Sequence, residues 1–374
     1  MGSAYTPGLT VSGDIIVRRI RRLPIKGEVL VQVGDSVHPD TVVAQAKLPG
    51  ALQTAKLADK LGIEARDVPD YLKLKPGDPI EKGQVVAESK GFFGFGKQSV
   101  LSDHTGTIES ISEVTGNMLI REPSIPVDVT AYLEGKVAEI MPEEGAIVET
   151  RGAMVQGIFG VGGERNGRIR IAVKDASQIL SPADILDSDR GAILVGGAGL
   201  TYDAIVRASQ VGVIGLIAGG VKDSDLTKFL GYDIGVAITG QEAITLTLLV
   251  TEGFGYLAMA ARTFELLKSL DGATASINGA TQIRAGVIRP ELIVPRQVPE
   301  GTAVEAVQAF ELKVGSPIRV IREPYFGALG VVTELPAQLM TVESGTEVRV
   351  LRAKLDDTSE VLVPRANVEI IALS

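Results

Sequence analysis

Residues 29–44 read VLVQVGDSVHPDTVVA, and residues 72–87 read LKLKPGDPIEKGQVVA. In each stretch a Gly-Asp pair, at Gly34 and Gly77, follows alternating residues, and both stretches end in Val-Val-Ala. Period-two alternation is typical of half-buried strands, and a Gly-Asp pair favours a tight turn between them. The sequence therefore predicts one β unit used repeatedly, with a weaker third copy between Lys136 and Val155.

The repeat resembles the barrel-sandwich hybrid of biotinyl and lipoyl domains, which also occurs in RNA polymerase subunits and in RnfC-like electron-transfer subunits. The stretch VLSDHTGTIESISEV (100–114) is similar to the other half of that fold. The resemblance implies a β domain over residues 1–165. It also implies a modified lysine at a hairpin tip, but the matching turn, 103–106, reads Asp-His-Thr-Gly. We therefore expect the fold to serve as a structural block.

Two segments interrupt the repeated strands. Residues 51–62 carry apolar side chains at helical spacing and end in glycine, so we expect an inserted helix that plugs the barrel or, alternatively, binds a partner. Residues 91–96 read GFFGFG, and the three phenylalanines are either tucked under a barrel or offered to a partner as an anchor. Phe92, Phe93 and Phe95 are therefore candidate partner-binding residues.

Residues 166–295 have a different sequence pattern. A strand, a glycine turn and a helix follow one another three times, with apolar runs at 191–199, 213–220 and 246–255. Thr201 is placed to cap the first helix. This order predicts a Rossmann-like, three-layer α/β unit on a parallel sheet, followed by a further strand pair. The whole chain is thus expected to be a multi-domain α+β protein.

Ligands of parallel sheets bind beyond the carboxyl ends of the strands. The candidate ligand-binding residues at this edge are Gly197, Gly199, Asp203, Gly219, Gly220, Asp223 and Glu252. The glycines and the helix starts behind them could hold a phosphate, and the acids could hold Mg²⁺. The alternative is that short turns need glycine for backbone reasons alone. The second interpretation is favoured, so neither a metal nor a cofactor is expected. No nucleophile or other catalytic residue can be named here.

The last part of the chain, residues 296–374, contains VGSPIRVIREPYFGALGVV. This stretch resembles the KOW motif of NusG-like transcription factors and ribosomal proteins, which implies an SH3-like barrel. Arg319, Tyr325 and Phe326 are its candidate partner-binding residues, with Arg319 on an exposed basic face. Acidic residues offset the arginines, so protein binding is favoured over RNA binding.

Composition excludes several classes of function. The 374 residues include no cysteine, which rules out disulfides, thiolate nucleophiles, iron–sulfur clusters and cysteine zinc sites. The net charge of −9 and the 4% aromatic content argue against a dedicated nucleic-acid binder. No signal peptide and no apolar run near the ~20 residues of a membrane span can be found. A cytoplasmic protein is expected.

Three functions fit these patterns. The first is a non-enzymatic scaffold or self-assembling structural protein that forms a homo-oligomer or binds protein partners. The second is a transcription- or translation-associated KOW factor that binds RNA, ribosome or polymerase, and the third is a nucleotide- or phosphate-binding α/β enzyme. The sequence favours the first. As a whole, the chain resembles a multi-domain family from which no activity carries over.

Overall fold

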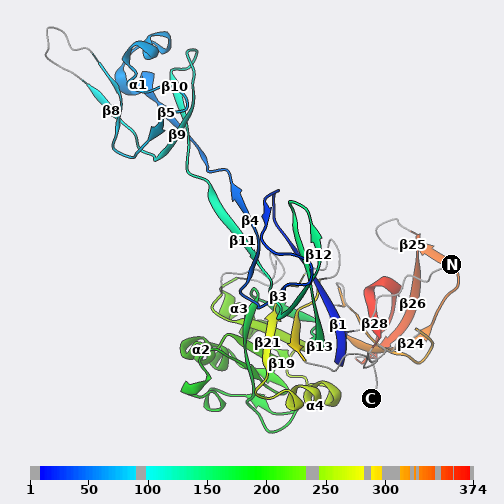
Figure 1. Cartoon of the computed structure of the whole chain (residues 1–374). Helices are drawn as coiled ribbons and strands as arrows, with labels where there is room; N and C mark the ends of the chain where they lie inside the picture. The colour runs from blue at the N-terminus through cyan, green and yellow to red at the C-terminus, as the bar shows by residue number, and fades with distance from the viewer. Residues whose placement is uncertain are drawn as a thin grey trace.

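The computed structural model describes residues 9–89, 98–232, 244–281, 288–296, 312–320, 324–325, 328–341, 347–356 and 358–370. Within these residues strands predominate, and they form several separate sheets (Figure 1). The expectation of a β-rich protein of several parts is therefore confirmed. None of the helices in the described part of the chain has the length and apolar character that a bilayer crossing requires.

The base of the molecule is built from two stretches of chain that are far apart in sequence. Its strands are β1 (Val11–Arg22), β2 (Glu28–Val29), β3 (Ser36–Val37), β4 (Val42–Leu48), β11 (Ile125–Thr130), β12 (Gly135–Met141) and β13 (Gly145–Gln156). One sheet runs β3-β12-β13 with β1 on the other side of β13, and a second runs β2-β4-β11. Val37, Val43, Leu133 and Val148 fill the space between the sheets.

The residues between β4 and β11 form a second unit, here called the arm module (residues 51–122). It contains β5 (Leu52–Lys56), α1 (Leu57–Leu61), η1 (Ala65–Tyr71), β6 (Pro79–Ile80), β7 (Val85–Glu88), β8 (Ser99–Leu101), β9 (Gly106–Ile111) and β10 (Asn117–Arg121). All buried apolar side chains of its core come from the module itself. Figure 1 shows it standing clear of the rest at the end of the two-stranded β4–β11 ribbon.

The two strong repeats have the same geometry in the base and in the arm module. Gly34 and Gly77 both have a φ of 93°, which favours glycine. The Gly34 amide donates to the Val137 carbonyl, and the Gly77 amide donates to the Ile108 carbonyl, each at 2.8 Å. Each copy therefore pairs with its own later strand, β12 in the base and β9 in the arm module.

The prediction of a third copy between Lys136 and Val155 is wrong. These residues form the β12–β13 hairpin, which pairs with the first copy as the β9–β10 hairpin pairs with the second. The apolar alternation does form strands, but the turn differs, because Glu143 takes the left-handed conformation there. The unit is a repeat followed by a partner hairpin, and it occurs twice.

The inserted helix is shorter than the predicted span 51–62. Residues 52–56 are strand β5, which pairs antiparallel with β10, and only Leu57–Leu61 are helical. The expected stop at Gly62 is confirmed, because Gly62 has a φ of 65° and its amide caps α1. Tertiary pairing with β10 outweighs the helical spacing of Leu52 and Ala55.

The parallel region follows the base. Its strands are β14 (Phe159–Val161), β15 (Arg165–Ile171), β16 (Ile179–Leu180), β17 (Ala192–Val195), β18 (Gly199–Leu200), β19 (Gly215–Val221), β20 (Thr247–Phe254), β21 (Thr274–Asn278) and β22 (Glu291–Pro295). Its helices are η2 (Pro182–Asp184), η3 (Asp187–Asp189), α2 (Tyr202–Val211), α3 (Asp223–Leu230) and α4 (Ala261–Ser269). The order β15-β17-β19-β20 is parallel throughout, and the expected strand pair β21–β22 is antiparallel. The Thr201 hydroxyl caps α2 as expected.

One sheet joins the base to the parallel region through β13. The first half of β13 pairs with β12, and its second half pairs with β22, while β1 runs along its other side. Hydrogen-bonded strands therefore continue across the boundary at residue 165 that the sequence suggested. The base and the parallel region share a strand.

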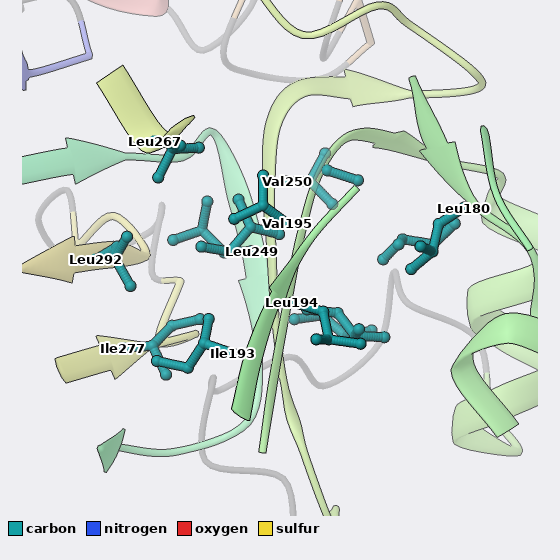
Figure 2. Close-up of a cluster of buried hydrophobic side chains, with 14 of the residues drawn as sticks. Leu180, Ile193, Leu194, Val195, Leu249, Val250, Leu267, Ile277 and Leu292 are labelled. Carbon is teal, nitrogen blue, oxygen red and sulfur yellow. The ribbon is translucent and has the colours of Figure 1, made fainter. Parts of the chain in front are cut away.

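The largest core lies in the parallel region. Figure 2 shows that it is built from β17 (Ile193, Leu194, Val195), β20 (Leu249, Val250), α4 (Leu267) and the antiparallel pair β21–β22 (Ile277, Leu292). These side chains are almost completely buried, as expected of strands covered on both faces.

The C-terminal sheet is a separate group of strands. It contains β23 (Pro317–Val320), β24 (Leu329–Glu334), β25 (Leu339–Thr341), β26 (Glu347–Leu355), β27 (Glu360–Pro364) and β28 (Val368–Ile370), with η4 (Arg365–Asn367). Its order is β25-β26-β24-β23-β28, with β27 beside β26. Its core, around Ile318, Val332 and Leu351, is made from its own residues.

Candidate functional site

The carboxyl edge of the parallel strands is filled by the protein's own backbone. The Gly219 amide donates to the Gly197 carbonyl at 2.8 Å, and both residues are buried. A β carbon at Gly219 would overlap the Leu257 carbonyl oxygen and lie 2.9 Å from the Met259 nitrogen. One at Gly220 would overlap the Gly255 carbonyl oxygen. The segment that follows β20 thus lies directly on these two glycines.

The other two glycines are covered in the same way. A β carbon at Gly197 would lie 2.6 Å from the Asp175 carbonyl oxygen, and one at Gly199 would lie 2.5 Å from the Tyr256 ring. The Ala198 amide donates to Gln178 and its carbonyl accepts from Leu257, each at 2.8 Å. These contacts favour the interpretation that the glycines allow close packing of the chain on itself.

The three predicted acids do not share a contact. Asp203 and Asp223 are exposed in the first turns of α2 and α3, where a negative charge is favoured without any ligand. Glu252 is mostly buried and pairs with Arg319. Across the described ranges, no group of three or more His, Asp or Glu side chains is placed to hold a metal ion.

The prediction that Arg319 lies on an exposed basic face is wrong. Its side chain is 3% exposed, and its guanidinium lies 2.9 Å from the Glu252 carboxylate. It also donates to the Thr251 carbonyl at 3.3 Å. Strand alternation predicts two faces, but it cannot show that one of them meets the end of β20. Tyr325 is 39% exposed, as a contact residue requires, whereas Phe326 lies outside the described residues.

Sequence reasoning missed the role of the arginine-rich strand β1. Its run Val-Arg-Arg-Ile-Arg-Arg spans residues 17–22, and such a run can mark a phosphate-binding strip. In the structure each arginine has its own glutamate: the pairs are Arg18–Glu149, Arg19–Glu291, Arg21–Glu164 and Arg22–Glu144. The positive charge of the strand is therefore neutralised within the protein.

Two of these pairs, Arg19–Glu291 and Arg21–Glu164, join the base to the parallel region around a buried tyrosine. Tyr132 has a φ of 64°, unusual for a bulky residue, and its hydroxyl lies 3.5 Å from Glu291. The Ser276 hydroxyl donates to the Tyr132 carbonyl at 2.6 Å. Burial, with the nearby charges of Glu291 and Glu164, raises the pKa of Tyr132 well above its ordinary value. The phenol is thus held protonated in a structural joint.

Comparison with known proteins adds no assignment. No protein-family model matches the chain, and a search of the curated proteins finds no match. Membership of the families that the motifs resemble is therefore not shown. What the protein does has to be inferred from its shape and its side chains.

Proposed function

We propose that this protein is a non-enzymatic scaffold that makes protein–protein contacts, with copies of itself or with protein partners, and that the arm module is its contact element. The observation that carries the proposal is the placement of the arm module. It has its own core and is held out by the β4–β11 ribbon (Figure 1). A unit that is presented in this way is accessible on most of its surface.

Apolar side chains on the arm module support this role. Val85 on β7 and Leu101 on β8 lie directly opposite each other, and both are exposed. The connection between these strands carries Phe92, Phe93 and Phe95, which lie outside the described residues and stay a predicted anchor. Exposed apolar pairs and aromatic anchors are typical of protein interfaces.

The charge distribution favours protein partners over nucleic acid. The four arginines of β1 are each paired with a glutamate, and Arg319 is paired with Glu252. A nucleic acid binds where free Lys and Arg side chains neutralise its phosphates and displace the counterions condensed on it. Together with the net charge of −9, this pairing lowers the positive potential that a phosphate backbone would meet.

We also propose the domain types that the sequence resembles. The unit of a repeat and its partner hairpin, which occurs in the base and in the arm module, supports a barrel-sandwich hybrid in each. Alternating parallel strands and helices support a Rossmann-like unit, and the six-stranded C-terminal sheet supports a KOW-type barrel. The lack of cysteine supports a cytoplasmic setting.

Deleting the arm module tests the proposal. Leu48 and Ile125 are directly paired at the outer end of the ribbon, so an Asn-Gly turn can replace residues 49–124 and close the hairpin. We expect the intact protein to form particles of several copies or to bind protein partners, and the deleted protein to lose this. Light scattering coupled to size exclusion measures both.

A matched control separates the exposed apolar pair Val85–Leu101 from the arm module as a whole. Replacing Val85 and Leu101 with threonine keeps the strands and removes their apolar contact surface. A monodisperse monomer of the intact protein at high concentration, together with the recovery of no protein partner in cross-linking, would refute the scaffold function.

A further inference from the structure

A buried ion pair joins the C-terminal sheet to the parallel region. Arg319 lies on β23 and Glu252 on β20, and their side chains are 3% and 18% exposed. Arg319 also donates to the carbonyl of Thr251, the residue before its acidic partner. The contact therefore engages the carboxyl end of β20 through both side chain and backbone.

The C-terminal sheet is otherwise self-contained in the described part of the chain. Among the described residues its strands pair with one another, and its core is made of residues between 312 and 368. This differs from the junction between the base and the parallel region, where strand β13 is shared. A unit with its own core and no shared strand can leave its neighbour without unfolding.

Glu252 has a second bond that links docking to helix α4. Its Oε1 accepts a hydrogen bond at 3.0 Å from the Ala260 amide, at the residue that precedes α4. Its Oε2 accepts from Arg319. The carboxylate thus holds the start of the helix and the C-terminal sheet at the same time.

We propose that the Arg319–Glu252 pair is a reversible latch, and that docking is an autoinhibitory contact. In the docked state the ion pair with Glu252 keeps Arg319 from other carboxylates. The KOW resemblance makes Arg319 a candidate partner-binding residue. In the undocked state Arg319 becomes exposed together with Tyr325, while both units stay folded. A partner that offers a carboxylate to Arg319 competes with Glu252 and shifts the equilibrium. The latch acts in the C-terminal sheet, outside the arm module, and does not depend on particle size.

Distance measurements on the full chain test the latch. The protein has no cysteine, so Glu265→Cys on α4 and Glu360→Cys on β27 give two unique labelling sites, both exposed. Double electron–electron resonance between spin labels at these two sites should show one narrow distance distribution for the docked state. Arg319→Ala and Arg319→Glu should broaden it, with the undocked fraction rising about tenfold or more, because Glu252 loses its buried partner.

Charge exchange provides the matched control. The double variant Arg319→Glu, Glu252→Arg should recover much of the narrow distribution, and Arg319→Lys should lie between the parent and Arg319→Ala. Hydrogen exchange of the cores around Leu351 and Leu249 reports whether each unit stays folded.

Three results would overturn the latch. The first is an unchanged distribution in Arg319→Glu. The second is loss of exchange protection in both cores of Arg319→Ala, since the pair would then be part of one common fold. The third is a short distance between labels placed on two separate chains, which would show that the C-terminal sheet docks on a second copy.

Discussion

Gly219→Ala is the substitution that best tests how the carboxyl edge of the sheet is used. The new β carbon would overlap the Leu257 carbonyl oxygen and press on the Met259 nitrogen at 2.9 Å, so the backbone after β20 would have to move. That backbone is held by the Leu257 amide, which donates to Ala198 at 2.8 Å, and by the Met259 amide, which donates to Ala176 at 3.1 Å.

The cost follows from these contacts. Losing two hydrogen bonds costs about 1 kcal/mol each. Overpacking of a close contact adds about 1–3 kcal/mol. We therefore expect Gly219→Ala to lower the free energy of unfolding of the parallel region by about 3–5 kcal/mol, which is a large part of the stability of an ordinary domain.

Urea unfolding followed by circular dichroism measures this loss, and hydrogen exchange at residues 255–259 locates it. Gly163→Ala is the matched control, because a β carbon there meets nothing within 4 Å, and it should be neutral or slightly stabilising. Equal stability of the two variants would refute the close-packing interpretation. A folded Gly219→Ala protein that had lost binding of a phosphate compound would instead support a ligand site.

Three further predictions concern other parts of the molecule. Arg19→Met leaves Glu291 buried without its cation and should cost about 3–5 kcal/mol in urea unfolding, whereas adding Glu291→Leu should recover most of that loss. If the double variant is no more stable than the single one, the pair is not an isolated ion pair. Asp35→Ala and Asp78→Ala each remove the side-chain acceptor of a matching turn, so each should cost about 1 kcal/mol, with faster exchange in the base for the first and in the arm module for the second. Exchange that rises in both units for either variant would contradict separate cores. Arg151 on β13 donates a hydrogen bond to Asp14 and thereby lowers the pKa of this carboxyl group. The Asp14 carboxylate therefore stabilises the protein above about pH 4, and its contribution is lost as the pH falls through the lowered pKa. The difference in melting temperature between the parent and Asp14→Asn should therefore shrink below pH 4, and a difference that grows there would contradict the assignment.

Local signals in the sequence predicted local structure well. Gly34 and Gly77 mark matching turns, Gly62 ends α1, and Thr201 caps α2, because each of these features depends on a few neighbouring residues. The succession of parallel strands and helices was predictable for the same reason. Buried strands and amphipathic helices carry their own periodicity.

Long-range pairing was not predictable from a single sequence. Nothing in residues 145–156 shows that β13 changes partners halfway along, from β12 to β22. Residues 52–56 have helical spacing and become a strand only because β10 lies beside them.

The use of the candidate ligand-binding edge was not predictable from the sequence for a related reason. Glycines at strand ends are needed both for anion cradles and for close backbone packing, and only the position of residues 255–259 separates the two. The role of Arg319 likewise depends on which surface β23 meets. The arginine run of β1 was a visible signal, but its glutamate partners come from three distant places in the chain: the β12–β13 hairpin, Glu164 and Glu291.

The way in which the ribbon joins the arm module to the base determines how a mechanical load would travel. Both strands leave the base at the same end, since Leu48 and Ile125 are neighbours at the outer tip. A pull on the arm module stretches β4 and β11 equally, so the hydrogen bonds between them are not sheared. The tension passes instead into the base, where β4 is bonded to β2 and the Tyr132 carbonyl just after β11 accepts from Ser276. A partner that pulls on the arm module would therefore strain the end of the ribbon that enters the base before it strains the β4–β11 pairing.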